Sequence, residues 1–383
     1  MYDTVIIGAG LAGLQCARLL GQRGLRVLLV DRKASVTEGV HTTGIFVRKT
    51  WEDFPLPDEQ LGPGIRDVFL LSPRHRELHL QAARDEFRVG RMPWIYLWLL
   101  EQATRSGVTW MPRTHLLRLE TMRDVTVLTL AHNGVEERVA ARFVVGADGP
   151  RSLVARQLGL DRNHEMIVGV EDVVAPRPGA KPALHCFVDP RFAPGYIAWI
   201  VDDGHEAHVG VGGYGERFNA AAALRAFRAS ITDRIPAEEQ GVERRGGLIP
   251  VNGILRRIAN RNGLLIGDAA GAVSPLTAGG LDPAMRLSSF AAEVIEAYLA
   301  TGDAAVLREY SGDRFRPRFI ARRWMRRTIR ALQQPLLVEL GCAALRTPPL
   351  RALASHIFFD RGGSFPDAAL SLGRPSLAPS SRP

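Results

Sequence analysis

The feature that most constrains this chain is a glycine-rich turn between two apolar segments at its start. Residues 4–7 (Thr-Val-Ile-Ile) predict a strand, and the sequence Gly-Ala-Gly-Leu-Ala-Gly follows directly at residues 8–13. A helical pattern then continues to about Gly24, and residues 27–30 predict a second strand that ends at Asp31. Strand, turn, helix and strand within roughly 30 residues form the βαβ unit of a parallel sheet.

The spacing of these glycines predicts a dinucleotide site. Gly8 permits the tight turn, Gly10 lets backbone N–H groups approach a pyrophosphate, and Gly13 lets the helix pack closely on the sheet. The N-terminus of the helix adds the positive end of its dipole. Asp31 is placed to accept hydrogen bonds from ribose hydroxyls, which a turn that served only helix packing would not require.

A second glycine pattern, Gly-Val-Gly-Gly-Tyr-Gly at residues 210–215, also precedes a helical stretch, at residues 219–231. No strand that ends in an acid follows this helix, because Arg234 and Pro236 stand where it would lie. We therefore predict a strand end and turn in an antiparallel sheet here, and a single nucleotide site in the chain.

Two later apolar runs also end in Gly and Asp. Residues 144–146 lead into Asp148, and residues 264–267 lead into Asp268. Each aspartate can close a turn or cap a helix. The carboxyl edge of a parallel sheet is also where ligands of this architecture bind, so both acids are candidates for the site that contains Asp31.

Composition places the chain among globular proteins of a reducing compartment. It has 383 residues, 46% of them hydrophobic, and three isolated cysteines without metal-ligand spacing. No signal peptide and no membrane-spanning run is predicted, which favours a cytoplasmic location. The net charge is +9, and almost all of the basic residues are arginines. Without a recognised motif, this positive charge does not indicate nucleic-acid binding.

The order of these motifs resembles the FAD-dependent oxidoreductases of the aromatic-hydroxylase superfamily, which have a glutathione-reductase-type Rossmann fold. The glycine-rich turn with Asp31 comes first, then Gly-Ala-Asp-Gly at 146–149, then Gly-Asp-Ala-Ala-Gly at 267–271 before Pro275 and the glycine pair 279–280. Within that superfamily the chain is most similar to the geranylgeranyl reductase group, through residues 194–200, 267–277 and 358–362. The resemblance covers residues 1 to about 367.

The resemblance implies an α/β fold with a Rossmann-type FAD-binding domain, an interleaved antiparallel substrate domain and a helical C-terminal region. We expect the FAD-binding domain at residues 1–45, 91–165 and 244–300, and the substrate domain at 46–90 and 166–243. The helical region follows at 301–372, and 373–383 form a mobile tail.

The resemblance also implies which residues hold FAD. Asp268 would accept a hydrogen bond from the ribityl chain, and the N–H groups of Gly280 and Leu281, at the start of a helix, would stabilise negative charge on the reduced flavin ring. The other residues implied in cofactor binding are Gly8, Ala9, Gly10, Leu11, Ala12, Gly13, Asp31, Arg32, Arg91 and Leu116.

The substrate side departs from the group's pattern. Tyr196 and Trp199 are expected to line the substrate pocket, but Val201 and Asp202 replace the Phe-Pro that follows in the group. Where the group often has a cysteine, the chain reads Val-His-Thr-Thr-Gly at 40–44. His41 there is a candidate proton donor, although a lone histidine is more often structural. No other catalytic residue and no metal site is predicted.

These observations favour reduction of a carbon–carbon double bond in an isoprenoid or other apolar substrate by hydride transfer from reduced flavin. NAD(P)H or a reduced ferredoxin is the expected electron donor. The alternatives are an FAD-dependent monooxygenase acting on a small apolar or aromatic substrate, and a non-catalytic FAD-binding electron carrier. Gly271 favours the reductase, because the hydroxylases commonly have histidine there.

The segment 314–330 carries eight arginines among aromatic and aliphatic residues. Its pattern is consistent with a helix that binds an anionic membrane surface, which would place the protein at the inner face of the membrane. An ordinary amphipathic helix with a solvated basic face is the equal alternative.

Overall fold

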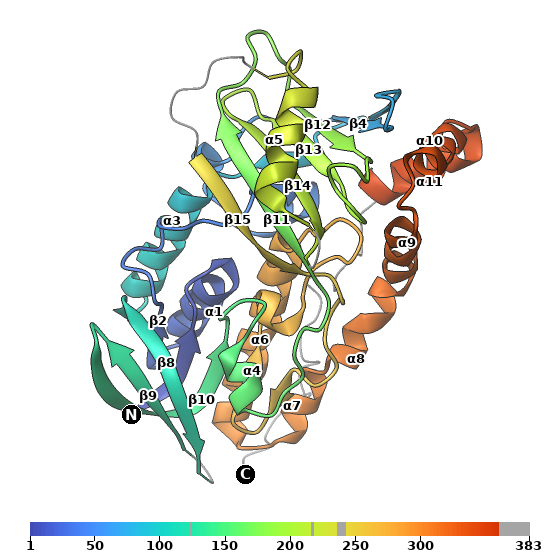
Figure 1. Cartoon of the computed structure of the whole chain (residues 1–383). Helices are drawn as coiled ribbons and strands as arrows, with labels where there is room; N and C mark the ends of the chain where they lie inside the picture. Colours follow the sequence, from blue (N-terminus) through green and yellow to red (C-terminus); the bar gives the residue numbers. More distant parts are fainter. Residues whose placement is uncertain (123–124, 216–217, 236–242, 360–383) are drawn as a thin grey trace, which may run out of the picture.

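Two sheets organise the chain, one in each half of the molecule (Figure 1). The computed structural model describes residues 1–122, 125–215, 218–235 and 243–359. Within them the first sheet has eight strands and the second has seven. A two-stranded ribbon of β3 (Ile45–Val47) and β6 (Phe87–Val89) completes the β-structure.

The first sheet is a parallel, Rossmann-type sheet. Its strand order is β16 (Ala259–Asn260), β17 (Gly263–Leu265), β10 (Val135–Gly146), β1 (Tyr2–Ile7), β2 (Val27–Val30) and β7 (Thr109–Met111). The strands from β17 to β7 run parallel, so the residues after β1, β2, β10 and β17 meet at one edge. The antiparallel hairpin β8 (Thr114–Thr121) and β9 (Thr126–His132) pairs with β10.

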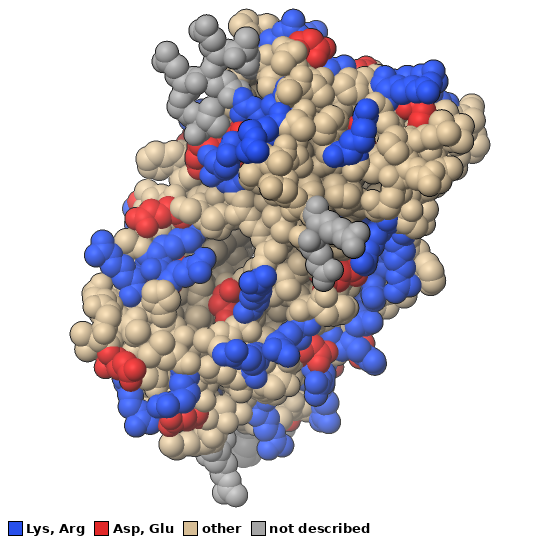
Figure 2. All heavy atoms as spheres, in the orientation of Figure 1, with Lys and Arg blue, Asp and Glu red and all other residues tan. Residues whose placement is uncertain are grey.

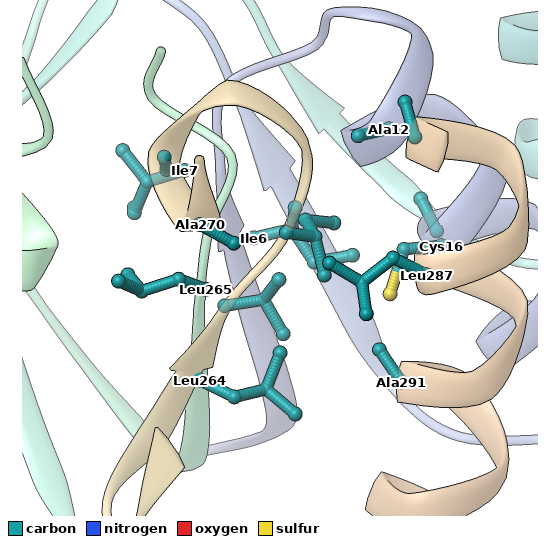
Figure 3. Close-up of a cluster of buried hydrophobic side chains, with 14 of the residues drawn as sticks. Ile6, Ile7, Ala12, Cys16, Leu264, Leu265, Ala270, Leu287 and Ala291 are labelled. Carbon is teal, nitrogen blue, oxygen red and sulfur yellow. The ribbon is translucent and has the colours of Figure 1, made fainter. Parts of the chain in front are cut away.

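Three helices cover one face of this sheet because their apolar sides pack on its buried strands. The central helix is α1 (Leu11–Gln22), which contacts both α3 (Met92–Arg105) and α6 (Leu281–Thr301). Cys16 of α1 and Leu287 of α6 lie against Ile6 and Leu264 of the strands (Figure 3). Helix α6 begins at Leu281, with Gly280 as its N-cap, so the helix start expected at these two residues is present.

The second sheet is built from segments far apart in the sequence. Its order is β15 (Glu243–Pro250), β11 (Met166–Val174), β14 (Ala207–Tyr214), β13 (Ala198–Asp202), β12 (Ala183–Phe187), β4 (Asp67–Leu71) and β5 (Glu77–Gln81). All neighbours are antiparallel except β12 and β4. The glycine-rich segment 210–214 lies inside β14, as predicted, and α5 (Ala220–Ser230) follows it and packs on the sheet.

One expected boundary is corrected. Residues 244–250 were expected in the FAD-binding domain, but they form β15, which pairs with β11 along its whole length in the second sheet. Hydrogen-bond register, which the local sequence does not encode, decides this assignment.

The chain then forms a string of short helices that runs from the first sheet to the second (Figure 1). These are α7 (Ala305–Glu309), α8 (Gly312–Phe315), a 3₁₀ turn at Arg316–Phe319, α9 (Ile320–Ala331), α10 (Pro335–Ala344) and α11 (Pro348–Phe359). The segment 314–330, expected as one helix, is divided, with Pro317 inside the 3₁₀ turn where a straight helix would lose a hydrogen bond. The predicted tail lies outside the described residues.

The remaining short helical elements lie earlier in the chain. They are α2 (Arg48–Asp53), α4 (Leu153–Gln157) and 3₁₀ turns at Asp58–Gln60 and Gly267–Ala270.

Candidate functional site

The glycines of the first turn have separable roles. Gly8 has φ +107°, and a Cβ there would lie 2.2 Å from the carbonyl oxygen of Ala147. A Cβ on Gly13 would lie 1.9 Å from the carbonyl oxygen of Gly8, so α1 can pack on β1 only without a side chain. A Cβ on Gly10 would meet no atom of the described residues within 4 Å. The fold itself therefore does not require Gly10, and the free space above it fits a bound pyrophosphate.

Asp31 is tied directly to this turn. Its carboxylate accepts hydrogen bonds from the backbone N–H groups of Ala9 (2.7 Å) and Lys33 (2.9 Å). The Thr114 N–H donates to the Asp31 carbonyl at 2.8 Å, so the start of β8, with its buried Leu116, lies beside the same turn. Arg32 is exposed next to Asp31. The residues expected around the ADP half of FAD are thus brought together.

Asp268 links the glycine-rich turn to the start of α6. A Cβ on Gly267 would lie 2.8 Å from the Ala12 Cβ, and a Cβ on Gly280 would lie 3.6 Å from the Asp268 Oδ1. Among the described residues no hydrogen bond reaches the Asp268 carboxylate, and burial raises its pKa to about 6. A partly buried carboxylate to which no described residue donates fits a ligand hydroxyl that would donate to it.

The third predicted aspartate has a structural role. Asp148 accepts hydrogen bonds from the Ser152 hydroxyl at 2.6 Å and the Leu153 N–H at 2.7 Å. It therefore closes the N-terminus of α4, which is the helix-capping alternative left open by the sequence.

Arg91 stands at the N-terminal end of α3, and its side chain is exposed. Its backbone N–H donates to the Gln60 carbonyl at 2.8 Å, and the preceding Gly90 pairs with Gly44. It does not line the cavity described below, so any contact of Arg91 with FAD stays a prediction.

An apolar cavity of about 600 Å³ begins at the N-terminus of α6. Gly280 and Leu281 lie on its wall together with residues 41–45, and it extends between the second sheet and helices α9 to α11. Tyr196 and Trp199 line it, as expected for a substrate pocket, with the Tyr196 hydroxyl donating to the Thr277 carbonyl at 2.9 Å. Its deeper wall is formed by Leu184, Cys186, Met325, Ile329, Leu345, Ala354, Ile357 and Phe358.

His41 also lies on the cavity wall. Partial desolvation lowers the pKa of His41, and the positive charges of Lys33 and Arg32 lower it further. The ring is therefore neutral near pH 7, which makes it a weak acid for proton donation.

A buried acid that the sequence analysis did not single out lies on the same wall. Glu171 of β11 is 4% exposed, and its Oε2 accepts hydrogen bonds from the Thr43 hydroxyl at 2.5 Å and from the Trp199 indole N–H at 3.2 Å. Burial alone would raise the pKa of Glu171, but His208, Thr43 and Arg245 outweigh it and the pKa is lowered. The only signal in the sequence is a charged residue within an apolar strand.

Comparisons with known proteins agree with this geometry. The FAD binding domain family matches residues 1–52 and 64–327. The chain is 30% identical over 337 residues to digeranylgeranylglycerophospholipid reductase 2 of Methanopyrus kandleri, covering 83% of both chains. It is 32% identical to reductase 1 of the same organism, covering 83% of this chain and 87% of the relative.

Solved structures share the fold. A geranylgeranyl bacteriochlorophyll reductase-like protein of Thermoplasma acidophilum superposes with a TM-score of 0.81 at 17% identity, covering 94% of this chain and 97% of its own. A p-nitrophenol 4-monooxygenase of Pseudomonas putida superposes with a TM-score of 0.69 at 18% identity, covering 95% and 94%. The fold is therefore shared by reductases and monooxygenases.

The extent of the family match makes this chain an FAD-dependent oxidoreductase of the FAD binding domain family. Its similarity to the archaeal enzymes places it more narrowly: the chain belongs to the geranylgeranyl reductase group.

Asp268 provides a test of the cofactor site in which stability and affinity change in opposite directions. Because burial raises the pKa of Asp268 from its ordinary 3.8 to about 6, the contribution of Asp268 to the stability of the FAD-free protein is present below pH 4 and lost as pH rises through 6. Asp268→Asn should therefore stabilise the FAD-free protein by about 2–3 kcal/mol at pH 8 and not at pH 4. Loss of one charge-assisted hydrogen bond should weaken FAD binding roughly 10- to 150-fold.

Urea unfolding at the two pH values and titration with FAD measure these changes. Unchanged FAD affinity in the Asp268→Asn variant would remove this carboxylate from the cofactor site.

Proposed function

We propose that this protein reduces carbon–carbon double bonds in the isoprenoid chains of a lipid. The observation that carries the proposal is the apolar cavity of about 600 Å³ that is lined by the N-terminus of α6, the second sheet and helices α9 to α11. Its mainly aliphatic and aromatic lining suits a hydrocarbon chain. The names of the archaeal relatives, digeranylgeranylglycerophospholipid reductases, support the same substrate class.

Bound FAD would supply the hydride for this reaction. The chain contributes binding and orientation. The turn at Gly8–Gly13 and Asp31 would hold the ADP half, Asp268 the ribityl chain, and the N–H groups of Gly280 and Leu281 the polar edge of the flavin ring. Tyr196 and Trp199 would flank the hydrocarbon chain as it approaches the ring.

Anaerobic turnover tests the proposal. Photoreduced enzyme is mixed with digeranylgeranylglycerophospholipid in detergent micelles, and the flavin absorbance is followed. We expect the substrate to reoxidise the flavin in the absence of oxygen and the product to gain two hydrogen atoms per reduced double bond. A flavin that stays reduced until oxygen is admitted would contradict the proposal.

The backbone at Gly271 supports reductase over monooxygenase chemistry. Gly271 has φ +68°, and a Cβ there would lie 2.5 Å from the Gly253 carbonyl oxygen. The histidine common in hydroxylases would not fit this conformation without a backbone shift.

We propose NAD(P)H or a reduced ferredoxin as the electron donor. The described part of the chain has no second Rossmann site for either donor. The second glycine-rich segment is buried within β14. Stopped-flow reduction by NADPH, NADH and ferredoxin, compared side by side, identifies the donor; failure of all three would overturn this choice.

We also propose that the outer surface of the C-terminal helices contacts a membrane. Five leucines of α10 and α11 are exposed: Leu336, Leu337, Leu340, Leu350 and Leu353. Charged side chains are sparse on this part of the surface, whereas basic ones gather nearer to α8 and α9 (Figure 2). No helix among the described residues is long and apolar enough to span a bilayer.

The arginines contribute less to this contact than the sequence suggests. Arg314 and Arg330 pair with Glu309 and Glu165 at 2.9 and 3.2 Å. Arg326 is buried against the rings of Tyr196 and Tyr214. The binding energy should therefore come mainly from the leucines.

Replacing Leu336 and Leu340 together by serine should weaken binding to lipid vesicles roughly 100-fold, because each leucine contributes about 1.5 kcal/mol or more when it enters the acyl region. Vesicle flotation measures the change, and Arg323→Gln with Arg327→Gln serves as the comparison. Equal flotation of the leucine variant and the unmodified protein would exclude this surface as the membrane contact.

A further inference from the structure

A chain of buried polar side chains crosses the second sheet from the surface to the cavity. It begins at Glu206, whose side chain is 52% exposed, and its Oε2 lies 4.0 Å from His208 Nε2. The His208 Nδ1 lies 3.5 Å from Glu171 Oε1, and the other Glu171 oxygen accepts the Thr43 hydroxyl at 2.5 Å. Thr43 and Glu171 both line the cavity.

The inner members of this chain are costly to bury. His208 is 1% exposed, and within the described part of the chain neither of its ring nitrogens has a hydrogen-bond partner, nor does Glu171 Oε1. Compared with uncharged residues of similar size, buried ionisable groups often add nothing to the stability of the fold or lower it. A glutamine at residue 171 would satisfy the Trp199 indole and the Thr43 hydroxyl equally well, so these contacts do not explain the acid.

We propose that Glu206, His208, Glu171 and Thr43 form a proton relay that delivers a proton from solvent to the substrate in the cavity. This inference rests on the proposed reduction of a carbon–carbon double bond. That reaction needs a hydride at one carbon and a proton at the other. Asp282 is another buried acid on the cavity wall with a hydroxyl contact, from Thr50 at 3.0 Å, but its Oδ1 is also paired with Arg286 at 2.9 Å.

The step balances as follows. The π bond breaks, one carbon receives the hydride and its two electrons from the reduced flavin, and the other carbon receives the Thr43 hydroxyl proton. The Glu171 carboxylate, which accepts the Thr43 hydroxyl at rest, receives a proton from His208 and passes it on to Thr43, and His208 is reprotonated from solvent through Glu206. The net consumption is one hydride and one proton from water.

Strand register explains how the relay forms. In the antiparallel pair β11·β14, Val173 lies opposite His208, two residues along β11 from Glu171, so both side chains lie on the same face. Other charged groups near them are Arg245 and Glu243 of β15, which pair with each other at 2.8 Å. These two groups influence the relay electrostatically but are not part of the proposed path.

Glu171→Gln is the first test, since it preserves the size of the side chain and an oxygen that accepts from Thr43 and Trp199 but removes the carboxylate that can take up and pass on a proton. We expect the rate of alkene reduction in anaerobic single turnover to fall at least 100-fold, as for loss of a general acid. The apparent KM, the FAD affinity and the melting temperature should stay unchanged. Glu243→Gln, the same substitution on the neighbouring strand, is the matched control and should retain the full rate.

A second measurement does not depend on turnover. In ¹⁵N-labelled protein, hydrogen exchange of the His208 ring is followed by NMR, with the signal assigned through His208→Gln. The exposed substitution Glu206→Gln should slow this exchange at least 10-fold without affecting the fold, whereas a purely structural histidine would exchange equally slowly in both proteins.

The outcomes separate the two proposals. Unmodified protein that reduces no double bond contradicts the proposed function. An active unmodified protein with an equally active Glu171→Gln variant contradicts the relay alone, and unchanged His208 exchange in Glu206→Gln overturns the path to solvent.

Discussion

Replacing Gly10 by valine is expected to weaken FAD binding by several orders of magnitude and leave the fold intact. A Cβ at residue 10 would meet no atom within 4 Å in the part of the chain that the structure describes. The backbone there is extended, with φ −78° and ψ −177°, which suits valine. The valine side chain would occupy the space assigned to the pyrophosphate. Loss of two charged hydrogen bonds to phosphate should weaken FAD binding roughly 10²- to 10⁴-fold. Isothermal titration with FAD measures this change.

Gly13→Val is the matched contrast. Its Cβ would clash with the Gly8 carbonyl oxygen at 1.9 Å, so α1 must move away from β1. We expect this variant to lose the cooperative unfolding transition, while the FAD-free Gly10→Val protein melts like the unmodified one. Normal FAD affinity in Gly10→Val would show that the cofactor does not lie on this turn.

The second large effect is expected from filling the deep end of the cavity. Ala354 of α11 is 4% exposed, lines the cavity and packs among apolar residues of the second sheet. Ala354→Trp should weaken the binding of a long isoprenoid chain by about 1–3 kcal/mol, which lowers kcat/KM for that substrate roughly 5- to 150-fold. A substrate with a short prenyl chain, which ends before this position, should be reduced at the normal rate.

Leu350→Trp on the same helix provides the control, because Leu350 is exposed and does not line the cavity. Steady-state assays with long and short prenyl substrates on both variants give the comparison. Equal losses for the two chain lengths in Ala354→Trp would indicate that the substrate does not extend to α11.

The parts of the structure that were predicted from the sequence are those with local signals. The first strand, the glycine-rich turn and the strand before Asp31 appear where they were expected because a βαβ unit is contiguous in the chain. The turn at Gly267–Ala270, which contains Asp268, and the start of α6 at Gly280 also follow from short glycine-containing motifs in the sequence.

The parts that were missed depend on contacts between distant residues. Thr43 and Glu171 are 128 residues apart, and only the folding of the 40–44 loop against β11 brings them together. The arginines of segment 314–330 formed a single basic pattern in the sequence, but tertiary contacts divide them. Arg326 stacks on two tyrosines, whereas Arg314 pairs with an acid. No local pattern distinguishes these roles.

The most direct test of the proposed reduction is the fate of oxygen during turnover. The enzyme is supplied with a reductant and digeranylgeranylglycerophospholipid under ¹⁸O₂, and the lipid products are analysed by mass spectrometry. We expect products that gain two hydrogen atoms per reduced double bond and contain no ¹⁸O. A lipid product that carries ¹⁸O would contradict the account and identify the protein as a monooxygenase.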